Sequence, residues 1–168
     1  QEVVRVFSGT TGEITLELTD TQVKFITPAA ELVSRLVAGD YPNYRAIIPT
    51  KFVTHSVVAV RNLASTIRGA AVFATKLNDI HVVLETPKRL LRISAVDPDK
   101  GDHTAVIPAE GSGDPLEVSF NYRYLLDGVE AIPTEELELA ATTTSSPAVL
   151  KPRGDTSFLY VLMPIRKA

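Results

Sequence analysis

From residue 55 onward, the apolar positions change their spacing in a regular order. A stretch with the two-residue alternation of a strand is followed by one with the three-to-four-residue spacing of a helix, and then by three more strand-like stretches. Turn-forming residues, such as Thr86-Pro87 and Asp97-Pro98, separate the later strands. The predicted ranges are 55–60 for the first strand, 61–75 for the helix, and 80–85, 89–96 and 104–108 for the other strands.

The same order then returns. Residues 116–120 have a strand pattern, Asn121 is a suitable helix cap, and Pro133 stops a helix that runs to about residue 131. Three strands are predicted to follow, over 135–142, 148–151 and 157–163. The two predicted helices begin about sixty residues apart, and another step back of that size reaches the start of the chain. Residues 13–18, 22–27 and 31–37 are the strands that this third copy predicts.

This repeat predicts an α+β fold built from duplicated β-α-β-β-β units. Residues 51–168 form a complete pair of units, whereas residues 1–50 form the second half of another. The chain begins at Gln1, and Glu2 to Phe7 have the pattern of a helix interior without a cap. We therefore expect the chain to be a fragment of a longer protein.

Both predicted helices have one apolar and one charged face. On the first helix, the residues at the spacing of a buried apolar stripe are Leu63, Ile67, Ala70, Ala71 and Ala74. On the second helix they are Tyr122, Leu125, Leu126 and Val129. Arg61 and Arg68 lie opposite the apolar stripe of the first helix, and Arg123 lies outside that of the second. A solvated polar face is the ordinary interpretation of such charges. The alternative is that repeated helices present spaced cations to a polyanion.

Composition limits the classes of protein. With 168 residues, 45% of them hydrophobic, the chain is long enough for one complete core, and it lacks an apolar run long enough to span a bilayer. We expect a soluble, cytoplasmic protein because no leader is apparent and cysteine is absent. A net charge of −3 argues against nucleic-acid binding by bulk attraction but permits a local basic face.

Candidate catalytic and metal-binding signals are weak. His55, His81 and His103 fall in or near predicted strands, without the spacing of a metal site or a nucleophile–base pair. The segment 97–102 is rich in aspartate but lacks the glycine position and distal glutamate of a calcium loop, so it is predicted to be a hairpin turn. Gly111 and Gly113 lack the strand-to-helix context of a phosphate loop. We therefore predict no enzymatic activity, metal or cofactor.

Two apolar segments are more informative. Residues 41–49, with the sequence YPNYRAIIP, combine two prolines and two tyrosines, so they are too stiff for a helix interior and too apolar for a solvated linker. Residues 158–166, with the sequence FLYVLMPIR, are predicted to include a buried strand that Pro164 ends. We expect both segments to pack against other parts of the protein.

Three motifs stand out in the chain: RLVAGDYPNYR over 35–45, FNYRYLLD over 120–127 and YVLMPIR over 160–166. Together they resemble the bacterial sliding clamp family, the beta subunits of replicative DNA polymerase. Residues 1–50 resemble the second half of the family's middle domain, and residues 51–168 its complete third domain. The resemblance implies a homodimeric ring in which sheets form the outside and helices line a hole that encloses duplex DNA. Such a ring is a processivity factor without catalytic activity.

The resemblance also implies functional residues. The candidates for facing DNA are Arg5, Arg61, Arg68 and Arg123. The family has a pocket that accepts short linear peptides from polymerase subunits, the clamp loader and repair proteins. The matching positions are Pro42, Ala46, Ile47, Asn121, Tyr124, Ser146, Pro147, Val161, Leu162, Met163, Pro164, Ile165 and Arg166. Ala46 departs from the family, in which a long basic residue is common there.

Ring closure in the family pairs a third-domain strand edge and helix end with the first domain of the other subunit. The residues that match this interface are Val72, Phe73, His103, Ala105 and Ile107. The family's glutamates are not reproduced, which shifts the expected interface toward apolar contact. A β-rich module that binds a protein or ligand, without any link to DNA, is the alternative that the residues themselves leave open.

Overall fold

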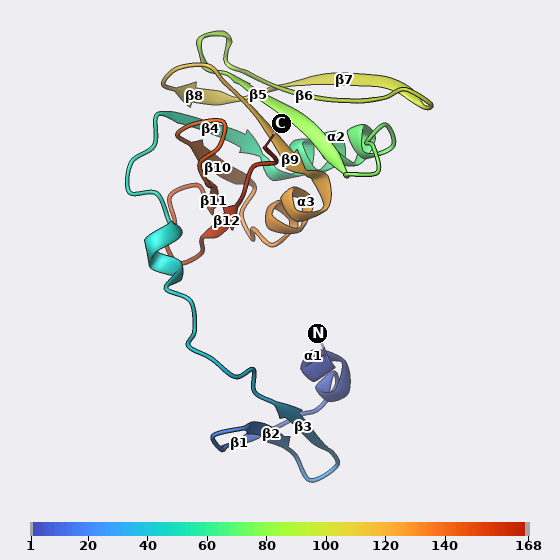
Figure 1. The fold of residues 1–168 in the computed structure, drawn as a ribbon, viewed down its shortest axis with the longest axis vertical. Coiled ribbons are helices and arrows are strands. Elements are labelled where there is room, and N and C mark those ends of the chain that lie inside the picture. Colours follow the sequence, from blue (N-terminus) through green and yellow to red (C-terminus); the bar gives the residue numbers. More distant parts are fainter. Residues whose placement is uncertain (1, 167–168) are drawn as a thin grey trace. The chain divides into compact units, whose positions relative to one another are not determined.

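The computed structural model describes residues 2–166 (Figure 1). Gln1 and residues 167–168, which belong to the predicted ranges 1–50 and 51–168, lie outside the described residues. The chain separates into two compact units, Gln1–Pro42 and Asn43–Ala168. Each unit is considered by itself.

The N-terminal unit contains a short helix and a small antiparallel sheet. Helix α1 (Glu2–Phe7) is followed by β1 (Thr15–Leu18), β2 (Gln22–Ile26) and β3 (Glu31–Arg35), which pair in the order β1-β2-β3. Phe7 is buried against Phe25, with ring centroids 6.4 Å apart. The three strands predicted here are confirmed, although each is shorter than expected.

The C-terminal unit contains two copies of the predicted repeat. After the 3₁₀ turn η1 (Tyr44–Ile47), the first copy comprises β4 (Thr54–Ala59), α2 (Val60–Ala71), β5 (Asp79–Glu85), β6 (Leu90–Asp97) and β7 (Gly101–Pro108). The second comprises β9 (Leu116–Asn121), α3 (Tyr122–Glu130), β10 (Glu136–Ala141), β11 (Ala148–Pro152) and β12 (Tyr160–Leu162). The duplicated β-α-β-β-β order is confirmed.

The two copies exchange their first strands. One sheet has the order β12-β11-β10-β4-β8 and the other β7-β6-β5-β9, with all neighbouring strands antiparallel. Strand β4 of the first copy therefore pairs with β10 of the second, and β9 of the second copy pairs with β5 of the first. Because each sheet needs strands from both copies, neither copy completes its own sheet.

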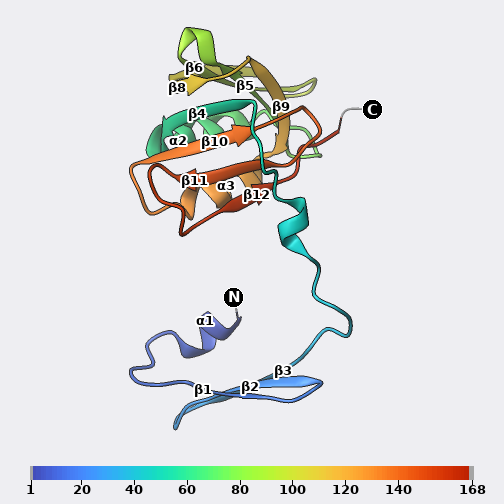
Figure 2. The ribbon, with the colours of Figure 1, turned by 90° about the vertical axis from the view of Figure 1, so that its left-hand side faces the viewer.

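Helices α2 and α3 lie side by side and pack against the sheets, as the views in Figures 1 and 2 show. Leu63 and Ile67 of α2 and Leu125 and Val129 of α3 have no exposed surface. They belong to one core cluster with inward residues of both sheets. The predicted apolar stripes are therefore the buried faces of both helices, although Ala71, Tyr122 and Leu126 are only partly buried.

The structure differs from the predicted elements in several places. Helix α2 ends at Ala71 rather than 75, because the following amides of Phe73 and Ala74 bond three residues back in a tighter turn. A short strand, β8 (Glu110–Ser112), was not predicted, since its glycine hides any alternation. Another 3₁₀ turn, η2 (Thr86–Lys88), lies between β5 and β6.

A further difference concerns the end of the chain. The predicted strand over 157–163 is reduced to the three residues of β12, at the edge of its sheet. Only Leu162 and Pro164 are fully buried there, whereas Leu159 and Met163 are exposed. The apolar run is therefore only half covered by the core, and the rest of it faces outward.

Candidate functional site

An apolar cavity lies where the end of the chain passes the start of α3. Its volume is about 500 Å³. The residues that line it are Leu77, Asn121, Tyr124, Tyr160, Val161, Leu162, Met163 and Ile165. They come from the loop before β5, the β9–α3 junction and the segment around β12.

Local hydrogen bonds fix this arrangement. The Asn121 side chain caps α3 by accepting a hydrogen bond from the Arg123 amide at 3.0 Å. The Tyr122 amide donates to the Asn78 carbonyl at 2.8 Å, which holds the loop containing Leu77 beside the helix. The Ile165 amide donates to the Ser119 carbonyl at 2.8 Å. The last described residues are thus tied to β9 and form a wall rather than a loose tail.

The cavity is both apolar and accessible. Leu162 is buried, whereas Met163 is 55% exposed and Tyr124 is 59% exposed, so adjacent side chains serve the core and the cavity. Burial raises the pKa of the Tyr160 hydroxyl, and the negative charge of Asp127 adds to this effect. The phenol therefore stays protonated at neutral pH and is available as a hydrogen-bond donor. Aliphatic side chains, a polarizable methionine and a few polar groups suit an extended peptide with apolar anchors.

The structure brings together six of the pocket residues that the sequence predicted. They are Asn121, Tyr124, Val161, Leu162, Met163 and Ile165. Sequence reasoning missed Leu77 and Tyr160. Leu77 sits in a loop whose next residue, Asn78, has a positive φ of 58°, and only the hydrogen bond to Tyr122 brings that loop to α3. The sequence offers one indication of this role: Leu77 is a large apolar residue in a loop, at a place where polar turn residues are usual.

The other predicted pocket residues lie elsewhere. Arg166 lines a second cavity, which shares Ile165 with the first, whereas Pro164 is buried. Ser146 and Pro147 are half-buried in the loop before β11 and line neither cavity. Ala46 and Ile47 belong to η1 and also line neither, and Pro42 belongs to the N-terminal unit. The contribution of these residues to a peptide site stays a prediction.

The four predicted DNA-facing arginines are all exposed. Three have a partner within their own unit. Arg68 of α2 forms an ion pair with Glu130 of α3, and Arg5 pairs with Glu2. Arg123 Nε donates to the Tyr122 hydroxyl at 3.3 Å. Among the described residues Arg61 has no ion-pair partner, so its charge is the most available for a phosphate.

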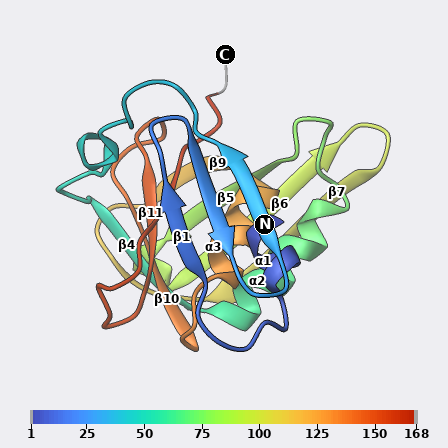
Figure 3. The same ribbon diagram turned by 90° about the horizontal axis from the view of Figure 1, so that it is seen from below.

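The residues predicted for ring closure meet at one edge of the second sheet. Strand β7 ends that sheet, and Figure 3 shows its hairpin with β6 at the margin of the unit. Val72, at the end of α2, is 63% exposed. The Phe73 ring stacks on His103, with centroids 5.6 Å apart and planes 8° apart. Ala105 is half-buried, whereas the Ile107 side chain faces the core, so at this position only the strand backbone is available to a partner.

The histidines have structural partners. His55 Nδ1 lies 2.7 Å from Glu138 Oε1, and His81 Nδ1 lies 2.9 Å from Ser119 Oγ. Within residues 2–166, no group of three potential metal ligands is close enough to hold an ion. Segment 97–102 forms the β6–β7 hairpin turn as predicted, with the Asp97 carboxylate accepting from the Asp99 amide. No helix in the described part of the chain has the length and apolar character needed to cross a membrane.

Comparison with known proteins places these features in a family. Residues 45–166 match the family described as DNA polymerase III beta subunit, C-terminal domain. The chain is 35% identical to the beta sliding clamp of Synechococcus elongatus over 136 residues, which is 80% of this chain and 36% of that protein. It therefore spans well under half the length of this curated relative.

Solved structures agree with this assignment. The DNA polymerase III subunit beta of Pseudomonas aeruginosa superimposes with a TM-score of 0.89 at 26% identity, covering 99% of this chain and 46% of that one. The sliding clamp of Bartonella birtlesii bound to griselimycin gives a TM-score of 0.89 at 26% identity, with 99% and 45% covered. The sequence prediction of the family and of its fold is thus confirmed, and the chain belongs to the DNA polymerase III beta subunit family.

Proposed function

We propose that this chain is part of a sliding clamp, a non-catalytic processivity factor that tethers a replicative polymerase to duplex DNA. The observation that carries the proposal is the apolar cavity beside α3 and β12, in a member of the beta subunit family. Residues 1–50 would then belong to the middle domain of the complete protein and residues 51–168 to its third domain. The β-rich module without any link to DNA is not favoured, because the family match covers most of the chain.

In this proposal the cavity is a docking site for short peptides of polymerase subunits, the clamp loader and repair proteins. Each large apolar side chain that leaves water for such a site contributes roughly 1.5 to 3 kcal/mol before ordering costs. Two or three anchors then give a dissociation constant of about a micromolar. Exchangeable binding of this strength suits a site that several partners share.

DNA contact would come from the charged faces of α2 and α3. A closed ring needs few phosphate contacts because topology, rather than affinity, keeps it on the duplex. Arg61 is available for such contacts, and Arg68 becomes available when a phosphate displaces Glu130. Ring closure would use the edge of β7 together with Val72 and Phe73. Since this activity takes place on DNA, we place the protein in the cytoplasm.

Peptide binding is the direct test of this function. A fluorescent peptide that contains glutamine followed by leucine and phenylalanine should bind with a dissociation constant of about a micromolar in fluorescence anisotropy. Met163→Ala and Tyr124→Ala should each weaken binding about five- to twentyfold, because both side chains line the cavity. Their midpoints of unfolding should stay nearly unchanged, since more than half of each side chain is exposed.

Val106→Ala is a matched control. Val106 is 48% exposed on β7 and lines neither cavity, so its loss should leave peptide affinity unchanged. If the folded wild-type protein does not bind the peptide at high micromolar concentration, the docking role is wrong. A parallel loss of stability and binding in the Met163 and Tyr124 variants would instead assign these residues to the core.

A further inference from the structure

The last turn of α3 carries a carboxylate where a cation is usual. Glu130 is the final residue of α3, and the turn over 127–130 contains no basic residue. The C-terminal end of a helix has a partial negative charge, so a carboxylate is disfavoured there and a cation is favoured. Helix α2 follows this rule, because Arg68 lies in its last turn. Any interaction that compensates for the position of Glu130 therefore has to come from outside α3.

The compensating cation comes from the neighbouring helix. Arg68 Nη2 forms an ion pair with Glu130 Oε1, which links the last turns of α2 and α3. Both groups face solvent, since 59% of the Arg68 side chain and 45% of the Glu130 side chain are exposed. Water competes for both groups, and an exposed ion pair of this kind is weak and exchangeable.

This pair belongs to the charged face that the two helices present. The exposed residues at helical spacing on this face are Arg61, Ser65 and Arg68 of α2 and Arg123, Asp127 and Glu130 of α3. Within residues 2–166, Arg68 is the one arginine of this face that forms an ion pair. The positive charge that the face offers to a polyanion therefore depends on whether Arg68 is held by Glu130 or free of it.

A DNA phosphate and Glu130 compete for the same guanidinium. Arg68 can form charge-assisted hydrogen bonds with a carboxylate or a phosphate, but the donor that Glu130 occupies is not available to a phosphate. A carboxylate that stays beside Arg68 also repels the phosphate. Binding of DNA at this point consequently requires that the ion pair opens.

We propose that Glu130 limits the contact of this face with DNA by holding Arg68 in an intramolecular ion pair that a phosphate has to displace. The opening of the pair keeps the contact weak and short-lived. Such contact suits a ring that topology keeps on the duplex and that has to move along it. This inference rests on the proposed sliding-clamp function and, within it, on the DNA contact of α2 and α3.

Fluorescence anisotropy with a labelled DNA duplex and the 168-residue chain tests the inference. At about 50 mM salt, Glu130→Gln should bind the duplex about two- to fivefold more tightly than the wild-type protein, the range typical of exposed ion pairs. The dependence of log affinity on log salt concentration should become steeper by about 0.9, as expected for one additional phosphate contact. Arg68→Gln should weaken binding, and adding Glu130→Gln to it should restore little.

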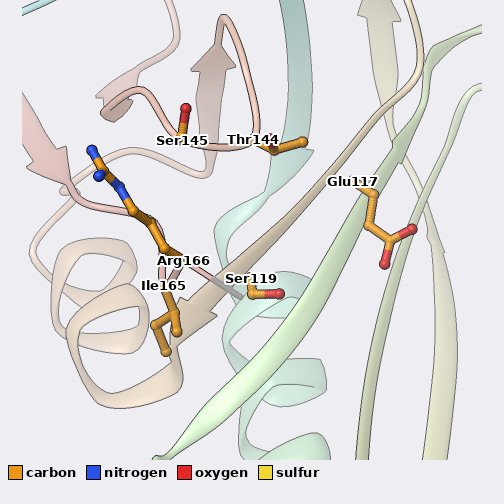
Figure 4. A pocket seen from close by; sticks show the side chains of 6 residues that line it. All are labelled: Glu117, Ser119, Thr144, Ser145, Ile165 and Arg166. Atoms are coloured by element: carbon orange, nitrogen blue, oxygen red, sulfur yellow. The ribbon is translucent and has the colours of Figure 1, made fainter. Parts of the chain in front are cut away.

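Two variants make a matched charge change elsewhere. Asp127 lies on the same face of α3 without an ion-pair partner within residues 2–166, so Asp127→Asn should gain less affinity than Glu130→Gln. Glu117 of β9 lines the second cavity and alternates with the buried Val118, so Glu117→Gln should leave DNA affinity unchanged (Figure 4). Glu130 lines neither cavity, and Glu130→Gln should therefore keep the peptide affinity of the wild-type protein.

Three results would contradict the inference. Equal DNA affinities of the wild-type protein and Glu130→Gln would overturn it and leave the DNA contact intact. An equal gain in Asp127→Asn, or a full gain of Glu130→Gln in the Arg68→Gln background, would show that the carboxylate acts by general repulsion and not through Arg68. If neither the wild-type protein nor Glu130→Gln binds the duplex, the DNA contact of α2 and α3 is wrong together with this inference.

Discussion

At the scale of single residues, close contacts decide where the apolar cavity forms. Gly128 of α3 lies against the Tyr160 ring, and a Cβ at this position would lie 2.6 Å from Tyr160 Cδ1 and 2.9 Å from Leu150 Cδ1. The missing side chain lets α3 approach β11 and β12 closely. Since Tyr160 lines the cavity, this approach also shapes the candidate binding surface.

We expect Gly128→Ala to destabilise the protein despite the better helix propensity of alanine. Overpacking costs typically 1 to 3 kcal/mol, and the propensity gain offsets about 1 kcal/mol of that. The free energy of unfolding, measured with urea, should therefore fall, by up to about 2 kcal/mol, and peptide affinity should fall with it. Gly69→Ala in α2 is the control, because its Cβ would meet only His103, with Nε2 at 3.4 Å. If both variants gain stability equally, the contact between position 128 and the Tyr160 ring has no steric cost, and the expectation is wrong.

At the scale of elements, β8 shows how a segment without a clear pattern becomes part of a sheet. The Thr54 hydroxyl donates to the Asp114 carbonyl and the Thr86 hydroxyl to the Gly113 carbonyl, both at 2.6 Å. Gly113 has a φ of +92°, and a Cβ on it would lie 1.8 Å from the Val53 carbonyl oxygen. Only glycine permits this strand end to pass so close to the segment before β4.

Two glycine variants separate backbone strain from steric overlap. Gly154 also has a positive φ, of +76°, but a Cβ on it would meet no atom within 4 Å. Gly154→Ala should cost only the strain of about 1 kcal/mol, whereas Gly113→Ala should cost about 3 kcal/mol or more. Urea denaturation measures both values. Similar costs for the two substitutions would mean that β8 moves away from Val53 without penalty.

At the scale of the whole molecule, the edge of β7 is the surface that matters for assembly. Among residues 2–166, β7 has a strand partner on one side alone, and Val72 is exposed next to the stacked pair of Phe73 and His103. In our proposal this edge pairs with a different domain of the second subunit and not with a copy of itself. An isologous contact between two such edges is therefore not expected.

We expect the 168-residue chain to sediment as a monomer, or as a weak dimer that dissociates on dilution. Sedimentation velocity at about 1 to 100 µM measures this, in the range where exposed apolar patches of small area self-associate weakly. Val72→Asp should leave the monomer unchanged and reduce any association at the highest concentrations. A tight dimer that persists at every concentration would contradict the assignment of this edge.

The sequence by itself determined the repeated helices and strands, their order and the family, but not β8 or the exact ends of α2 and β12. Periodicity identifies strands and helices because side-chain direction alternates along a strand and rotates along a helix, and these rules are local. The buried faces of α2 and α3 and the cap at Asn121 follow from such rules. The motifs at 120–127 and 160–166 pointed to six residues of the apolar cavity, since matching segments fold alike within a family.

Only the tertiary structure decided which distant residues meet. The exchange of β4 and β9 between the copies, the position of β8 and the contribution of Leu77 depend on long-range hydrogen bonds and packing, which leave no local period. The second cavity is also of this kind. Glu117 and Arg166 are far apart in sequence, and they face the same hollow because the Ile165 amide bonds to the Ser119 carbonyl. Local patterns record which face of an element is apolar, whereas the fold decides what lies opposite that face.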